Sequence, residues 1–267
     1  MIIQYGICVL QGNRPLLEDS HTILTPFLPE DKNSFFFAIY DGHGGNEIAY
    51  YAAANVHQFV AQAYQNCQSM EQALVTGIKR ADSALKNTQY LNERAQSSGS
   101  TAIIVVIKDN KLYVANVGDS RALLSRAGKV IPLSVDHKPN REDEKQRIEQ
   151  AGGNVNDVEG IARVNGNLAI SRSIGDHALR DAGIIATPEI TVTTLTDEDD
   201  FILLACDGVF ESQTKIDNEL VISIIQQSLN ENKHTCDKAE KAAKLVANLA
   251  YTKGSGDNIS VLVITLK

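Results

Sequence analysis

Short apolar runs, separated by polar or turn-forming residues, recur along this chain and predict its strands. The predicted strands are residues 2–10, 35–40, 101–107, 111–117, 121–125, 190–195, 201–206 and 259–266. Lys108-Asp109-Asn110 separates two of these runs and predicts a hairpin turn. Because Gly128 offers a further turn, we expect residues 120–130 to extend this antiparallel meander.

Longer stretches with apolar residues at helical spacing lie between the groups of strands and predict helices. They cover residues 45–66, 69 to about 92, 140–151, 218–230 and 237–253. Ser69 and Gln72 form a capping box at the start of the second helix, and Asn140 is expected to cap the third. Strands in meanders and helices in adjacent pairs argue against a parallel doubly wound fold. We therefore predict an α+β fold, a β-sandwich of two mainly antiparallel sheets flanked by pairs of antiparallel helices, as one domain over residues 1–267.

The composition is that of an ordinary globular domain, with 43% hydrophobic and 22% charged residues in a chain of 267. The net charge of −8 argues against a nucleic-acid-binding scaffold. No apolar run approaches the roughly 20 residues of a membrane helix, and the first residues do not resemble a signal peptide. The four cysteines form no CxxC pair, which favours a reducing compartment and argues against zinc. We expect a monomer, cytoplasmic or else nuclear or secreted without a signal peptide, that binds neither nucleic acid nor membranes.

An aspartate followed by glycines stands at the end of the apolar run 35–40, in Asp41-Gly42-His43-Gly44-Gly45. The run is buried, so Asp41 lies where the chain emerges, and the glycines allow a sharp turn and a close approach. Two interpretations are open from this string alone. Asp41 either caps the next helix or belongs to a metal or phosphate site.

The same pattern recurs, which favours the metal site. Asp207-Gly208 ends the run 201–206, Asp257 precedes the run 259–266, and Glu18-Asp19 follow the first strand. Neighbouring carboxylates repel one another unless cations lie between them, and oxygen ligands favour Mg²⁺ or Mn²⁺. The four aspartates of this cluster, Asp19, Asp41, Asp207 and Asp257, exceed what one magnesium ion usually takes from protein. They predict two ions, roughly 3.5–4 Å apart, that share a carboxylate and activate a water.

Three further groups could contribute to such a site. The backbone carbonyl of Gly42 is open to a metal ion because no side chain blocks it. Arg14 could grip a phosphate bidentately, although an arginine in a loop is more often a surface residue. His43 could protonate a leaving group, or it could simply bond a neighbouring carboxylate in the turn.

The order of motifs along the chain resembles the metal-dependent serine/threonine protein phosphatases of the type 2C (PPM) family, especially eukaryotic-type members. The resemblance extends over residues 6 to 264, and its motifs are RPLLED at 14–19, DGHGG at 41–45, SGSTA at 98–102, NVGDSR at 116–121, DHKP at 136–139, RVNGNLAISR at 163–172, CDGVFE at 206–211 and GDNIS at 256–260. Each motif is weakly specific alone, but their order and spacing are specific. Phe210 and Glu211 stand where the family usually has tryptophan and aspartate, a conservative change.

The resemblance implies a β-sandwich with a two-metal site at one edge and phosphorylated proteins as substrates. Asp41 would bridge two Mn²⁺ or Mg²⁺ ions, with Gly42, Asp207 and Asp257 as further direct ligands. Glu18 and Asp19 would act mainly through metal-bound waters. Arg14 would hold the substrate phosphate and His43 would be the general acid. Asp119, otherwise an ordinary turn residue, would help Asp207 to bind a weaker third ion.

We therefore expect a protein serine/threonine phosphatase that uses a metal-activated bridging water and forms no covalent intermediate. A non-catalytic pseudophosphatase with the same fold is one alternative, although none of the expected metal ligands is missing. A metal-dependent hydrolase of small phosphate esters is the other. Relative rates on p-nitrophenyl phosphate, nucleotides and a phosphothreonine peptide separate this hydrolase from the protein phosphatase.

Overall fold

The first of two large sheets contains both ends of the described chain. A computed structural model describes residues 3–266, and position 2 of the first predicted strand lies outside them. This sheet has the order β1-β15-β14-β8-β9. Its strands are β1 Ile3–Leu10, β15 Ile259–Leu266, β14 Asp199–Ala205, β8 Arg121–Arg126 and β9 Lys129–Pro132. Each neighbouring pair is antiparallel.

The second large sheet is also antiparallel and has the order β13-β7-β6-β3-β2. Its strands are β13 Glu189–Thr194, β7 Lys111–Val117, β6 Ala102–Lys108, β3 Phe35–Tyr40 and β2 Ser20–Leu24. The predicted hairpin between β6 and β7 is confirmed, with Asp109 and Asn110 both at positive φ. Two such residues match the twist of a two-residue hairpin turn.

Strand β3 explains why the predicted strands read as continuous apolar runs. Phe37 and Ile39 face the core between the two sheets, whereas Phe36, Ala38 and Tyr40 belong to the core between the second sheet and its helices. Both faces of the strand are therefore buried, which removes the alternation of a half-exposed strand.

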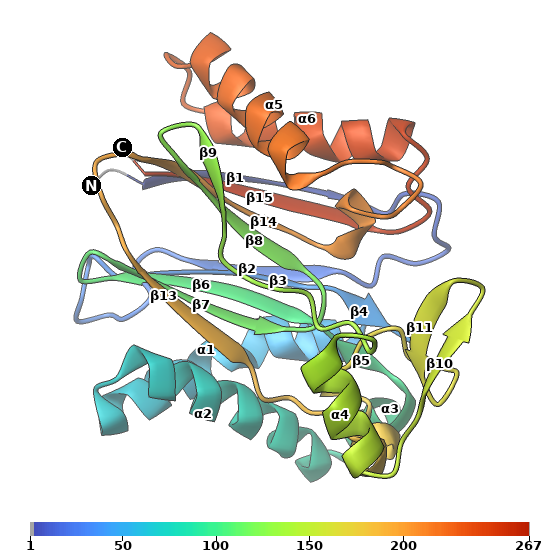
Figure 1. Cartoon of the computed structure of the whole chain (residues 1–267). Helices are drawn as coiled ribbons and strands as arrows, with labels where there is room; N and C mark the ends of the chain where they lie inside the picture. The colour runs from blue at the N-terminus through green and yellow to red at the C-terminus, as the bar shows by residue number, and fades with distance from the viewer. Residues whose placement is uncertain (1–2, 267) are drawn as a thin grey trace.

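Each sheet is covered on its outer face by a pair of helices (Figure 1). Helices α1 (Glu47–Cys67) and α2 (Met70–Ala84) pack on the second sheet, and α5 (Asn218–Glu231) and α6 (Lys238–Thr252) pack on the first. The result is four layers, helices, sheet, sheet and helices. The predicted α+β sandwich is confirmed.

Two helix predictions need correction. The predicted helix from 69 to about 92 ends at Ala84, continues as a 3-10 turn at Leu85–Asn87, and is followed by a separate helix α3, Gln89–Ser97. Thr88 interrupts it in an extended conformation, which lets α3 turn back toward α1. Ser69 does cap α2 as predicted. Asn140 does not cap the helix α4, Glu142–Gln150, whose first flanking residue is Arg141.

Small elements that the apolar pattern did not predict gather near one edge of the sandwich. A three-stranded sheet has the order β12-β5-β4, formed by Ile174–Gly175, Gly99–Ser100 and Gly42–His43. A hairpin of β10 (Val155–Val158) and β11 (Ile161–Val164) projects beside α4 (Figure 1). Within residues 3–266, no helix has the length and apolar character to cross a membrane.

Candidate metal centre

The strand register brings the predicted acids to one edge of the sandwich. In the first sheet, the end of β1 pairs with the start of β15, as Leu10 with Ile259, and the end of β14 pairs with the starts of β8 and β15. In the second sheet, Ser20 pairs with Tyr40 and Ala102 with Val117. These strand ends lead directly into Asp41, Asp119 and Asp207, and the corresponding strand starts follow Asp19 and Asp257.

At this edge two short connections cross between the two sheets, and each of them carries acidic residues. Residues 11–19 connect β1 to β2 and contain Glu18 and Asp19, and residues 118–120 connect β7 to β8 and contain Asp119. Carboxylates from both sheets therefore meet at the crossings. If each connection stayed within one sheet, the carboxylates of the two sheets would lie in separate loops.

The buried Asp19 and the partly exposed Asp41 form the centre of the cluster. A carboxylate oxygen of each and the Cys206 sulfur all lie within 4.8 Å of one another. Burial raises the pKa of Asp41 well above its ordinary value, and the charges of Asp19, Asp207, Asp119 and Asp257 raise it further. Burial also raises the pKa of Asp19 to about 6, against a hydrogen bond from Ser260. The carboxylates therefore repel one another strongly while no cation separates them.

Asp207 lies in the same field of negative charge, beside a lysine. Burial and the charge of Asp119 raise the pKa of Asp207 well above its usual range, and the charge of Lys138 opposes this. The ammonium of Lys138 forms an ion pair with Asp119 and lies 3.9 Å from Asp207 Oδ2. Asp119, expected at a third metal position, is thus next to Asp207, and its side chain is 4% exposed.

Arg14 contacts the carboxylate cluster at Asp257. Its Nη2 donates to Asp257 Oδ2 at 2.7 Å, and its side chain is 48% exposed. The loop before Asp257 is held by Glu211, whose Oε2 accepts from Ser255 Oγ at 2.9 Å and from Gly256 N–H at 2.8 Å. Arg14 therefore has one face on the carboxylates and the other in solvent, where a phosphate can approach.

Glu18 and Gly42 are in close contact. A Cβ on Gly42 would lie 2.4 Å from the backbone oxygen of Glu18, so only glycine fits at this position. Glu18 Oε1 accepts from Gly45 N–H at 2.5 Å, and the Glu18 N–H donates to Asn258 Oδ1 at 2.8 Å. The glycine turn after Asp41 is therefore fixed by the crossing that carries Glu18, as well as by its own conformation.

His43 does not contact a metal-ligand candidate in the described structure, but it has an acidic partner. Its Nε2 lies 2.8 Å from Asp176 Oδ2, and the Asp176 side chain is 5% exposed. Burial acts to lower the pKa of His43, but the hydrogen bond and charge of Asp176 raise it above the ordinary value. This geometry is compatible with both roles expected for His43, a structural hydrogen bond to a carboxylate and protonation of a leaving group.

The donor set fits hard divalent cations. The clustered side chains are carboxylates, and the neighbouring Cys206 keeps its proton because burial and the charges of Asp19 and Asp41 raise its pKa well above its usual range. The raised carboxyl pKa values mark groups whose charged forms a bound cation would stabilise.

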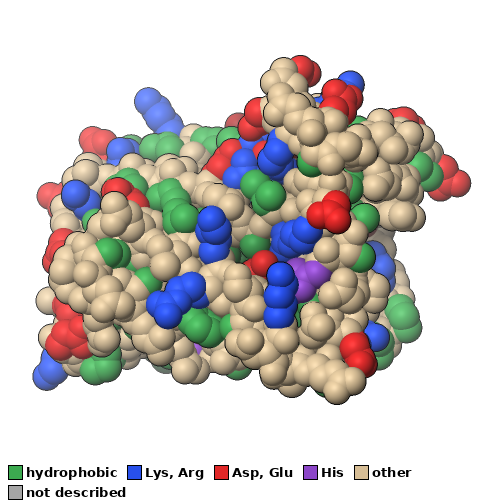
Figure 2. Space-filling view, turned by 90° about the horizontal axis from the view of Figure 1, so that it is seen from below, with side chains coloured by type: hydrophobic (Ala, Val, Ile, Leu, Met, Phe, Trp, Pro, Cys, Tyr) green, Lys and Arg blue, Asp and Glu red, His purple; other side chains and the backbone are tan. Residues whose placement is uncertain are grey.

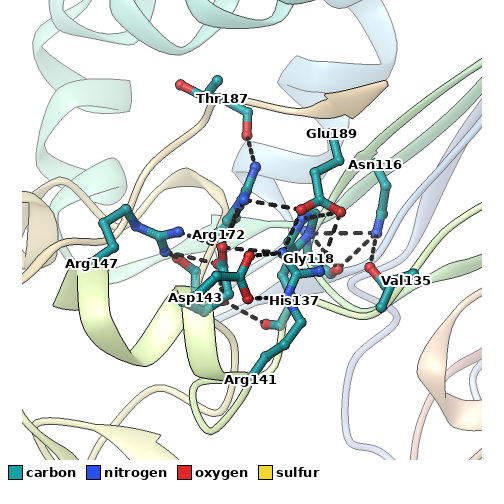
Figure 3. Close-up of polar contacts among 12 residues, drawn as sticks. Asn116, Gly118, Val135, His137, Arg141, Asp143, Arg147, Arg172, Thr187 and Glu189 are labelled. Carbon is teal, nitrogen blue, oxygen red and sulfur yellow. Dashed lines mark hydrogen bonds and ion pairs between the residues drawn. The ribbon is translucent and has the colours of Figure 1, made fainter. Parts of the chain in front are cut away.

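A second group of possible metal ligands consists of His137, Glu144 and Glu189. One ligand atom from each residue lies within 4.8 Å of the other two. Glu144 is already paired with Arg147 and Arg172 and accepts from Ser171 Oγ, so its pKa lies below the ordinary range in spite of burial. Figure 3 shows these arginines around the group. Their positive charges make it an ion-pair network and disfavour a cation there.

Sequence reasoning did not single out Asp176, Lys138, Ser260 or Asn258, although they organise the site. Lys138 and Asn258 stood inside quoted motifs without a role. Asp176 follows Gly175 at positive φ, which repeats the pairing of acid and glycine seen at Asp41 and Asp207. That pairing is the signal that could have found Asp176.

Comparison with known proteins agrees with the motifs. The family model described as protein phosphatase 2C matches residues 3–259. Protein phosphatase 2C homolog 2 of Aspergillus fumigatus is 36% identical over 284 residues, which cover 98% of this chain and 64% of that protein. Probable protein phosphatase 2C 8 of Oryza sativa subsp. japonica is 34% identical over 306 residues, covering 99% and 75%.

Solved structures share the fold. A Caenorhabditis elegans structure titled as a sex determining protein superposes with a TM-score of 0.88 at 26% identity, covering 99% of this chain and 65% of that one. The serine-threonine phosphatase 2C of Toxoplasma gondii has a TM-score of 0.84 at 23% identity, covering 98% and 94%. The chain spans less than two thirds of three fungal relatives, 64%, 63% and 61% of their lengths. On the family match and these identities, the chain belongs to the protein phosphatase 2C family.

Proposed function

We propose that this chain hydrolyses phosphoserine and phosphothreonine in proteins with water activated at a divalent metal centre, and that no phosphoenzyme forms. The observation that carries the proposal is the convergence of the buried Asp19 with the partly exposed Asp41 and Asp207, because the pKa values of all three are raised. Folding has gathered groups that repel one another, which is costly unless cations are to be bound there. Arg14 at the solvent side gives the site a phosphate-binding group.

The proposed ligands follow from these positions. Asp41 would be shared by two Mn²⁺ or Mg²⁺ ions, with Asp207, Asp257 and the Gly42 carbonyl as the other direct protein ligands. Glu18 and Asp19 would act through waters, and Asp119 with Asp207 would hold a weaker third ion. When bound, such ions supply an activated water at neutral pH and offset the charge of the phosphate.

The chain itself would bind the substrate and donate a proton. Arg14 is placed to donate two hydrogen bonds to the phosphate oxygens, because its guanidinium is half exposed beside Asp257. His43 would protonate the leaving serine or threonine oxygen. Because Nε2 of His43 faces Asp176, Nδ1 is the ring atom left to donate that proton.

A phosphothreonine peptide assay titrated with Mn²⁺ and with Mg²⁺ tests the proposal. We expect phosphate release that requires the ion, disappears in EDTA, and is lost in Asp41→Asn and Asp207→Asn. Asp197→Asn, an exposed aspartate in a loop away from the cluster, is the matched control and should keep full activity. Release that persists in EDTA would contradict the proposal.

The same assay decides between the alternatives. Faster turnover of p-nitrophenyl phosphate or nucleotides than of the peptide would indicate a hydrolase of small phosphate esters. Binding of Mn²⁺ without any phosphate release would indicate a pseudophosphatase. The monomeric state stays a prediction, which light scattering on the purified chain can measure.

A further inference from the structure

The ammonium group of Lys138 lies among the carboxylates of the candidate metal centre. Lys138 Nζ is paired with Asp119 and lies 3.9 Å from Asp207 Oδ2. The pKa of Lys138 is raised because the charges of Asp119 and Asp207 outweigh the effect of burial. Asp119 and Asp207 are also the two side chains that a weaker third metal ion would use. A lysine ammonium therefore lies against both of its proposed ligands.

The position of Lys138 is fixed by the residues just before it. Asp136 accepts from Arg121 through both carboxylate oxygens, with Nε to Oδ1 and Nη2 to Oδ2 distances of 2.9 Å. His137 N–H donates to the Gly118 oxygen at 3.0 Å, and Gly118 N–H donates to His137 Nδ1 at 3.1 Å. Figure 3 shows His137 packed between Gly118 and the ion-pair network.

The backbone of residues 136–138 is also held by Ser171. The backbone oxygen of His137 accepts from both the N–H and the Oγ of Ser171, each at 2.9 Å. Gly118 immediately precedes Asp119, so the backbones that carry the lysine and its aspartate are bonded to each other. The ion pair is therefore part of the assembled fold, whereas a pair between two flexible surface side chains would contribute little.

The lysine is nevertheless able to leave. Its side chain is 41% exposed, and four flexible carbons connect the ammonium to the fixed backbone. A divalent ion bound to Asp119 and Asp207 would replace the single positive charge of Lys138 with two. Because the ammonium and that ion would be held by the same two carboxylates and repel each other, they would compete for this position.

We propose that Lys138 is a built-in competitor for the third metal position, so that its ammonium must swing away before a third divalent ion binds. The inference rests on the proposed metal centre and adds a residue that sets its stoichiometry. With Lys138 in place, the first two ions would still bind through Asp41, Asp257 and Asp207, while the third position stays weak. The lysine thereby gives Asp119 and Asp207 a counter-charge at low metal concentration.

The test measures Mn²⁺ binding directly, by calorimetry and by the paramagnetic resonance of free Mn²⁺, without substrate. In Lys138→Met we expect the third ion to bind at least tenfold more tightly, while the first two affinities change less than twofold. Lys138→Arg, which keeps the charge, should stay close to the parent protein. Lys145→Met removes a comparably exposed lysine on α4 and serves as the matched control.

Asp119→Asn completes the design, because it should abolish the third ion in the parent and in Lys138→Met alike. Circular dichroism in EDTA checks that each variant folds, and Lys138→Gln provides a second neutral variant. An unchanged or weaker third ion in both neutral variants overturns the inference, as does a stoichiometry of two in every protein. If Lys138→Met instead raises only the KM for the peptide, Lys138 is a substrate contact and the inference is wrong.

Failure of the proposed function gives a different pattern. A parent protein that binds no Mn²⁺ would refute the metal centre itself. Mn²⁺ binding with the predicted Lys138 effect, but no phosphate release, would refute the phosphatase activity and leave the role of Lys138 intact.

Discussion

Ser260 Oγ donates a 2.6 Å hydrogen bond to Asp19 Oδ2, although 241 positions separate the two residues. The bond joins β15 to the first crossing between the sheets and holds the Asp19 carboxyl in a buried position. Burial outweighs the bond, so the pKa of Asp19 is still about 6. The metal-free protein must therefore be sensitive to pH in a definite direction.

We expect the metal-free protein to become more stable as the pH falls from about 7 to about 5. A carboxyl group whose folded-state pKa is raised destabilises the fold above that pKa and ceases to do so as it is protonated. For Asp19 alone, a rise of roughly two units from the usual value corresponds to about 3 kcal/mol in full, of which about 1.3 kcal/mol is recovered between pH 7 and pH 5, because the unfolded chain is still ionised there. Urea unfolding in EDTA across this pH range measures it.

Saturating Mn²⁺ should abolish or reverse this trend, because the bound ions stabilise the ionised carboxylates. Below about pH 4.5 the metal-free protein should lose stability again, since Glu144 has a lowered pKa and its ion pairs with Arg147 and Arg172 need the charge. Stability in EDTA that rises steadily from pH 5 to pH 7 would contradict the prediction.

Asp41→Asn should change stability in opposite directions with and without metal. In EDTA it removes one charge from a buried repulsive cluster, and we expect the free energy of unfolding to rise by about 1–3 kcal/mol. In Mn²⁺ it should lose most of the stabilisation that the ion gives the parent. Paired denaturant curves measure both effects, and Asp197→Asn should show neither. A loss of stability in EDTA would mean that Asp41 is not repelled by its neighbours.

Glu211→Gln should weaken metal binding from a distance. Glu211 accepts from Ser255 and Gly256, and this fixes the loop that carries Asp257. Hydrogen bonds to a charged acceptor contribute about 1.5–3 kcal/mol, so we expect the Kd for Mn²⁺ to rise by roughly tenfold or more. Calorimetry measures the Kd. Glu219→Gln, at the start of α5, should leave it unchanged, and an equal effect in both variants would indicate a general loss of charge.

Asp176→Asn should reduce turnover without affecting metal binding. Asp176 bonds Nε2 of His43, and its amide replacement removes the charge that favours the protonated ring. We expect kcat to fall about 10²-fold, within the range that general acids contribute, with KM little changed. Full kcat on a phosphothreonine peptide would assign His43 to a structural role. An aryl phosphate with a good leaving group should be affected much less, because it needs little protonation.

The strand ends could be predicted from the sequence because one physical pattern marks them. A run buried on both faces, such as residues 35–40, must end where the chain meets solvent, and Asp41 marks that point. The meander signals then predict antiparallel pairing, which places alternate ends at the same edge. The sandwich and the main carboxylates follow from these local patterns.

The rest depends on contacts that no local pattern records. The helix after Ser69 was predicted too long because Leu85, which is fully buried, and Thr88 redirect the chain, and α3 then packs on α1. The partner of His43 was missed because Asp176 is 133 positions away and reaches it through β12 and β5. Lys138 was quoted without a role because its meaning lies in its distance to Asp119 and Asp207.

The distribution of charge on the surface also differs from what a net charge of −8 suggests. Figure 2 shows lysine and arginine side chains across the middle of the face seen from below, with many acidic side chains nearer its margin. A basic area on an acidic protein attracts acidic ligands over a short range only, because salt screens charges beyond about 10 Å.

The two crossings between the sheets have a consequence for biosynthesis. Asp257 and β15 are the last of the site to be made, and β15 lies between β1 and β14, so the first sheet stays split until residues 259–266 are available. Until then the nascent chain has Asp19, Asp41 and Asp207 without Asp257. Occupancy of the proposed metal centre would therefore require a domain that has been synthesised through β15.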